Sequence, residues 1–116
     1  MSENKVDINE VDINEFKKLD IRVGTVVKVE NIKGAKRLYR VQVDLGELGI
    51  RQTISGLAEV YKADELLGKR VVFLANLKPA KLMGETSEGM LLAAENDAVV
   101  SLLSIDREIS SGSKIH

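Results

Sequence analysis

The residues with the clearest capacity for chemistry lie in one polar segment that joins two apolar runs. Lys78 and Lys81 are flexible cations suited to phosphate oxygens. Asn76 carries an amide that donates and accepts hydrogen bonds, and Ser87 adds a hydroxyl. Met90 follows as either an adaptable apolar contact or a core residue. These residue types favour binding of a polyanion through its phosphates, without bond-making chemistry.

Charge is segregated along the chain, although the formal net charge is only −1. Residues 22–40 carry six Lys and Arg side chains against one Glu, and residues 69–81 carry four with no acid. Residues 1–20 are acidic, with six carboxylates against three lysines. If the two basic stretches share one side of the fold, they form a patch for a phosphate backbone; otherwise they are a solvated surface with chance clustering. A predicted basic loop over 31–37 supplies the candidates Lys33, Lys36 and Arg37.

The composition argues against an enzyme. The 116 residues contain no Cys and a single His, His116, so zinc fingers, Cys nucleophiles and His-based triads are not expected. Carboxylates are plentiful, but none stands in a metal-ligand cluster or beside a nucleophile motif. Asp44 and Glu47 flank a predicted hairpin, and a solvated turn explains them. We therefore expect no catalytic residue, no metal and no cofactor.

Length and hydropathy predict one domain in the cytoplasm. A chain of 116 residues leaves little room for a second core. It has no apolar run near the roughly 20 residues of a membrane span. Its first residues are polar and acidic, unlike a signal peptide. We expect residues 1–11 to be a polar lead-in and residues 12–116 to form the folded domain.

The start of this domain has the pattern of a short helix. Asp12 is a favourable N-cap, and Glu15 stands three residues later, as in a capping box. Ile13, Phe16 and Leu19 then recur at helical spacing, which predicts about two turns.

Beyond Leu19 the apolar residues alternate with period two, which is typical of strands with one buried face. Gly24, inside the first alternating run, predicts a bend or a bulge. A short helix over 63–68 is predicted to separate the third and fourth strands, and 78–89 to be a loop. A sixth strand or an extra packed layer is predicted over 99–105. The five main strands are predicted over 21–30, 39–45, 50–56, 70–75 and 90–94.

Short strands at regular spacing with Gly-rich turns favour a small β-barrel or sandwich. A helix between the third and fourth strands is the usual OB-fold placement. We therefore predict an all-β fold: a five-stranded OB-fold barrel with short helices and a C-terminal extension.

Aromatic side chains are few. Phe16 and Phe73 lie on apolar patterns and are predicted to be core, whereas Tyr39 is either a surface stacker or a packing residue. This scarcity argues against reading bases by stacking. It favours recognition of nucleic acid through backbone and shape.

Six short motifs occur in the order in which one known family has them. They are FKKLDIRVG (16–24), VQVDLG (41–46), RQTISG (51–56), NLKPAKLMG (76–84), SEGMLLAA (87–94) and GSKI (112–115). In these motifs the chain resembles the tRNA-binding domain found at the C-terminus of methionyl-tRNA synthetases. The same domain occurs as a free-standing bacterial tRNA-binding protein and as an archaeal β subunit. The set of motifs is specific, although no single motif is.

The resemblance implies an OB-fold that grips the outer corner of the tRNA L and raises the affinity of a partner aminoacyl-tRNA synthetase for tRNA. The methionyl-tRNA synthetase catalytic subunit is the expected partner. Stand-alone members of the family imply a homodimer built through the N-terminal helix and the C-terminal segment. The RNA contacts that the resemblance implies by position are Asn76, Lys78, Lys81, Ser87 and Met90.

Arg37 joins these contacts at the lysine of the family's usual Ala-Asp-Lys-Leu motif. Here Lys36 stands where the family has an acid. The change strengthens the basic loop and leaves its detailed geometry open.

Two other functions fit parts of the sequence. A CsaA-type protein-export chaperone shares the barrel and the FxKLDIRxG opening, and would bind unfolded peptides instead of RNA. Its resemblance is weaker over 76–90. Alternatively, the acidic residues 1–20 dock a partner protein and the basic patch is incidental.

Overall fold

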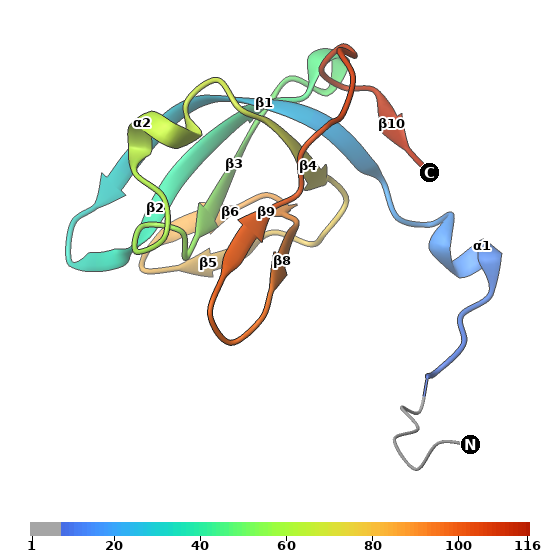
Figure 1. Cartoon of the computed structure of the whole chain (residues 1–116), viewed down its shortest axis with the longest axis horizontal. Helices are drawn as coiled ribbons and strands as arrows, with labels where there is room; N and C mark the ends of the chain where they lie inside the picture. Colours follow the sequence, from blue (N-terminus) through green and yellow to red (C-terminus); the bar gives the residue numbers. More distant parts are fainter. Residues whose placement is uncertain (1–7) are drawn as a thin grey trace.

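The computed structural model describes residues 8–116 (Figure 1). Of the predicted lead-in over 1–11, residues 1–7 lie outside the described part, and the remaining residues precede the first helix without regular structure. Strands dominate the regular structure, which confirms the all-β prediction. None of the described helices is long and apolar enough to cross a bilayer.

The first helix, α1 (Ile13–Phe16), begins at the predicted capping box. The Asp12 carboxylate accepts a hydrogen bond from the Asn14 N–H at 2.8 Å, and Glu15 Oε1 accepts one from the Asp12 N–H at 3.1 Å. The predicted second turn is wrong. The helix ends before Leu19, and the backbone of Asp20 is instead hydrogen-bonded to Ala75 and Asn76, which follow β4 (Arg70–Leu74).

The centre of the fold is an antiparallel, barrel-like sheet. Its main strands are β1 (Ile21–Ile32), β2 (Ala35–Asp44), β3 (Ile50–Ser55), β4 (Arg70–Leu74) and β7 (Met90–Leu91). They are ordered β3-β2-β1-β4-β7. The long β1 is shared, because its first part pairs with β4 and its second part with β2. The five predicted main strands are therefore present, as the OB-like barrel requires.

The bend in β1 lies at Val26–Lys28, where one extra residue shifts the register with β2. Gly24 is not the bulge that the sequence predicts, because it pairs with Val71 of β4 in regular register. A Cβ atom at Gly24 would stand 2.3 Å from Val43 Cγ1. Glycine is needed there for close packing between strands.

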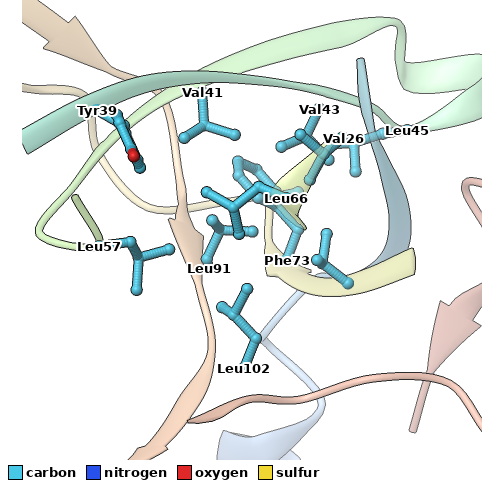
Figure 2. Packing of buried hydrophobic residues seen from close by; sticks show 12 residues of the cluster. Val26, Tyr39, Val41, Val43, Leu45, Leu57, Leu66, Phe73, Leu91 and Leu102 are labelled. Atoms are coloured by element: carbon cyan, nitrogen blue, oxygen red, sulfur yellow. The ribbon is translucent and has the colours of Figure 1, made fainter. Parts of the chain in front are cut away.

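The core is filled by the inward-facing residues of the strands (Figure 2). Val41 and Val43 of β2 and Phe73 of β4 are fully buried. Leu66 packs into the same cluster from α2 (Ala63–Leu66), the predicted helix between the third and fourth strands. A barrel with an apolar interior leaves only its outer face and its hairpins for ligands.

The aromatic residues do not form a stacking surface. Tyr39 is buried, and its hydroxyl donates to the Tyr61 carbonyl at 2.8 Å, so packing is its role. Phe73 is buried as predicted. Phe16 is not core, since 37% of it is exposed on α1.

The predicted basic loop over 31–37 is wrong. Ile32 of β1 pairs with Ala35 of β2, so only Lys33 and Gly34 form the turn. Lys36 and Arg37 lie on β2 instead, because the strand pairing continues almost to the tip of the hairpin.

The predicted loop over 78–89 is also structured. It contains the hairpin of β5 (Ala80–Leu82) and β6 (Glu85–Ser87). The predicted fifth strand over 90–94 divides into β7 and β8 (Ala93–Glu95), and β8 pairs with β9 (Val100–Leu102). β9 confirms the predicted sixth strand in shortened form.

The C-terminal extension returns to the start of the barrel. β10 (Lys114–Ile115) pairs with β1, with Ile115 opposite Ile21. Both the N-terminal segment and the C-terminal strand therefore meet at one end of β1, as Figure 1 shows.

Candidate nucleic-acid interface

The β5–β6 hairpin carries Lys81 on a short, rigid ladder. Lys81 pairs with Thr86 across the hairpin, and its side chain is exposed. Met83 and Gly84 form the turn with φ angles of 55° and 78°. Two successive positive φ angles are the signature of a type I′ turn, which suits the twist of the flanking strands. The lysine is thus presented by a defined strand instead of a loose loop.

Arg40 fastens this hairpin to the barrel. From β2, its guanidinium donates to both carboxylate oxygens of Glu85, at 2.9 and 2.8 Å, and to Glu30 of β1 at 3.0 Å. The hydrogen bonds with Arg40 hold the pKa of Glu85 below its ordinary value. Arg40 therefore serves as a brace and is not free for phosphate.

Ser87 lies in the seam that closes the barrel. Its hydroxyl oxygen accepts a hydrogen bond from the Ile54 N–H at 3.1 Å and lies 3.1 Å from Thr53 Oγ1. Thr53 donates in turn to the Gly89 carbonyl at 2.9 Å. Within residues 8–116 no strand ladder joins β3 to β7, so these bonds bridge the gap. Ser87 thus has a structural role at its predicted position.

Asn76 holds the segment that precedes β1. Its Oδ1 accepts a hydrogen bond from the Asp20 N–H at 2.8 Å, and its Nδ2 donates to the Lys18 carbonyl at 2.6 Å. Both polar atoms of the amide are therefore engaged within the protein.

Lys78, Lys81 and Met90 are exposed, and 47% of Met90 is accessible, which rules out the core alternative for it. Among residues 8–116 neither lysine forms an ion pair with a carboxylate. Two ammonium groups without a carboxylate partner among the described residues, together with an accessible apolar side chain, suit a phosphate backbone.

The β1–β2 hairpin carries the other candidates. Lys33 and Lys36 are exposed and unpaired among the described residues, whereas Arg37 Nε lies 3.4 Å from a Glu59 carboxylate oxygen. In Figure 1 the tip of this hairpin lies at the end of the molecule opposite α1. The structure does not gather all eight candidates at one point, but spreads them along the molecule.

The basic stretch over 22–40 is also less positive than its sequence indicates. Four of its six cations pair with carboxylates. They are Arg22, Lys28, Arg37 and Arg40.

A metal site finds no support in the part of the chain that the structure describes. No group of three or more His, Cys, Asp or Glu side chains there is placed to hold a metal ion. The surface offers cations and hydrogen-bonding groups, which bind and position a ligand.

A family profile described as "Putative tRNA binding domain" matches residues 21–114. The match runs from the start of β1 to β10 and so includes the barrel and both hairpins. The chain belongs to this tRNA-binding domain family. The family inferred from the sequence motifs is thereby confirmed.

Relatives of this tRNA-binding domain include a synthetase. The methionine–tRNA ligase of Methanococcus vannielii is 60% identical over 106 residues, which are 91% of this chain and 16% of that protein. The chain thus spans about a sixth of the length of that curated relative. The match supports a relation to methionyl-tRNA synthetase.

Two solved structures resemble the tRNA-binding domain closely. The MetRS-related protein from Pyrococcus horikoshii has 36% sequence identity and a TM-score of 0.87, over 94% of this chain and all of that one. The chaperone CsaA from Bacillus anthracis has 30% identity and a TM-score of 0.85, over 93% of this chain and all of that one. The fold by itself therefore does not separate RNA binding from a chaperone role.

The sequence did not reveal the brace and the seam. Arg40 and Glu85 are 45 residues apart, and Thr53 and Ser87 are 34 apart. Opposite charges or hydroxyls at such separations carry no periodic signal.

Proposed function

We propose that this tRNA-binding domain is a non-catalytic module that recognises the shape of tRNA at its outer corner and assists an aminoacyl-tRNA synthetase, the methionyl enzyme in particular. The observation that carries the proposal is a pair of exposed lysines, Lys78 and Lys81, which have no carboxylate partner among residues 8–116 and lie on the segment whose motif indicates tRNA binding. The 60% identity to a methionine–tRNA ligase favours the methionyl partner.

The chemistry of this surface suits recognition of a shape. Lysines meet phosphates without reading sequence, and Met90 offers an adaptable apolar contact to a ribose or base edge. Tyr39 is buried and provides no stacking platform. Such a surface tolerates many tRNA sequences and depends on the path of the folded backbone.

The proposal also includes an oligomeric state, the homodimer, and a location, the cytoplasm. A second copy of the chain is a suitable partner for α1, on which Ile13 is 61% exposed and Phe16 is 37% exposed. The module would act in the cytoplasm beside the catalytic subunit that it supplies with tRNA.

Reversal of the two lysine charges tests the RNA site. Lys78→Glu with Lys81→Glu should weaken tRNA binding at least about tenfold, and should reduce the log–log salt slope by roughly 1.5 units, since each lost phosphate contact removes nearly one unit. Gel-shift titrations at several salt concentrations measure both quantities.

The matched control is Lys62→Glu with Lys69→Glu, two exposed lysines flanking α2 that make the same change in net charge. Figure 1 places α2 away from the β5–β6 hairpin. Equal affinities for the two double variants would contradict the site.

The CsaA-like structures favour one second candidate, a peptide-binding chaperone. Binding assays with tRNA and with an unfolded polypeptide, on the same protein preparation, distinguish the two candidates. Retention of an unfolded polypeptide, with no tRNA bound at moderate salt, would replace the RNA proposal by the chaperone one.

A further inference from the structure

The segment between α1 and β1 is tied to the chain that leaves β4. Three hydrogen bonds make the tie. Asn76 accepts from the Asp20 N–H at 2.8 Å and donates to the Lys18 carbonyl at 2.6 Å, and the Ala75 N–H donates to the Asp20 carbonyl at 2.7 Å. Lys17 precedes the tied residues directly. Residues 18–20 are therefore fixed against the barrel, although α1 itself buries none of its residues.

This tie brings two further lysines into the neighbourhood of Lys78. Lys17 and Lys18 are exposed and have no carboxylate partner among residues 8–116. Lys78 stands two residues after Asn76, on the strand-to-hairpin connection. Lysines from two distant parts of the sequence thus stand within two residues of the same hydrogen-bonded junction.

The only acid in the tied segment is already neutralised. Asp20 accepts hydrogen bonds from Arg22 at 2.5 and 3.2 Å. Arg51 lies on the same side, since its guanidinium donates to the Ala75 carbonyl at 2.9 Å. Lys114 stands opposite Arg22 in the β1–β10 ladder. These cations, led by the hydrogen bond from Arg22, lower the pKa of Asp20.

The sequence conceals this excess of positive charge. Residues 1–20 hold twice as many carboxylates as lysines, so they read as an acidic tail. Glu15 is used in the cap of α1, and Asp20 is paired with Arg22, which leaves Lys17 and Lys18 unopposed within the tied segment.

We propose that Asn76 is a positioning residue that fixes Lys17 and Lys18 as additional phosphate contacts, so that the RNA-binding surface continues past Lys78 onto the α1–β1 junction. This inference rests on the proposed function and reassigns Asn76 within it. The amide holds protein backbone, and the lysines that it orders touch the phosphodiester backbone.

The salt dependence of tRNA binding tests the assignment. Lys17→Gln with Lys18→Gln should weaken binding several-fold and lower the log–log salt slope by roughly 1.5 units. Asn76→Ala should lower the slope as well, because the two lysines lose their fixed position. Loss of a neutral amide contact to RNA would weaken binding and leave the slope unchanged, which would overturn the positioning role.

A double-mutant cycle provides the second readout. If Asn76 acts only through the lysines, the triple variant should bind tRNA as the lysine double variant does. Additive losses in the triple variant would show that Asn76 acts on RNA separately and would overturn the proposal. Lys62→Gln with Lys69→Gln is the matched control for charge.

The outcomes also separate this inference from the proposed function. If Lys78→Glu with Lys81→Glu weakens binding while Lys17→Gln with Lys18→Gln changes neither affinity nor slope, the proposed function stands and this inference fails. A wild-type protein that binds no tRNA overturns both. If Asn76→Ala fails to fold by thermal unfolding, the variants of the two exposed lysines still decide whether the surface extends.

Discussion

At the scale of single residues, charge alone is a poor guide to which side chains bind phosphate. Arg40 and Arg22 belong to the most basic stretch of the sequence, yet each is hydrogen-bonded to a carboxylate. Lys78 and Lys81 come from a stretch with fewer cations and have no carboxylate partner in the part of the chain that the structure describes. The difference arises because Arg40 meets carboxylates of β1 and β6, and Arg22 meets Asp20 two residues earlier in the chain. Lys78 and Lys81, before and on the β5–β6 hairpin, are exposed to solvent.

The Arg40 brace predicts a lowered pKa for Glu85. Arg40→Met should return that pKa toward the ordinary glutamate value, as measured by NMR titration of the side-chain carboxyl carbon. Because the folded-state pKa lies below the unfolded one, the stabilisation is present at neutral pH and is lost as pH falls through the lowered pKa. The Arg40→Met variant should lose stability at neutral pH and show a weaker decline in acid.

Asp20 is the internal reference in the same spectra. Its pKa is lowered mainly by the hydrogen bond from Arg22, so Arg40→Met should leave it unchanged. An unchanged pKa for Glu85 in Arg40→Met would contradict the brace.

At the scale of elements, the hairpins decide how the cations are presented. Both segments predicted to be loops, 31–37 and 78–89, contain antiparallel ladders that end in two-residue turns. A ladder fixes the direction of each side chain. Because its residues are already ordered in the free protein, little conformational entropy is lost when a ligand binds. The tip of β5–β6 nevertheless keeps one unfavourable residue, Met83, at positive φ.

Replacement of that residue should stabilise the domain. Asn followed by Gly is the preferred pair for a type I′ turn, so Met83→Asn should raise the free energy of unfolding by about 0.5 kcal/mol. Urea unfolding measures the change. Lys33→Asn is the matched control, because Lys33 also precedes a turn glycine but does not have a positive φ. An equal gain in both variants would point to general solubility effects in place of the turn.

At the scale of the whole molecule, α1 stands apart from the barrel (Figure 1). Its apolar residues Ile13 and Phe16 are accessible, and so is Leu19 beyond it. Apolar side chains on a single exposed turn gain little within one chain, since a helix of this length is not stable by itself. Burial against a second copy would supply what the isolated helix lacks.

The dimer proposal predicts the effect of charges on that face. Ile13→Lys with Phe16→Lys should yield monomers in light scattering, because two buried cations cannot be accommodated in an apolar contact. Asn14→Lys, on the same helix, is the control and should leave the mass unchanged. Dimers that persist in the double variant would place the interface elsewhere.

The sequence alone determined the parts that depend on local pattern. Period-two alternation predicted the five main strands, the capping box predicted the start of α1, and six motifs indicated the family. Composition predicted a binding module without Cys or His chemistry. These features are local, because strand faces, caps and motifs are written in residues close together in the chain.

Tertiary structure alone decided which polar residues are free. Asn76 meets Lys18 and Asp20 across 56 to 58 residues, and Arg40 meets Glu85 across 45. No local spacing encodes such contacts, since they form only when distant strands pack. These contacts give Asn76, a predicted RNA contact, the role of holding the segment before β1. They also make Arg40, from the predicted basic stretch, the brace of the β5–β6 hairpin. Among residues 8–116 they leave Lys78 and Lys81 without a carboxylate partner, as they do Lys17, Lys18, Lys33 and Lys36. A charge can bind phosphate only where the fold has not already neutralised it.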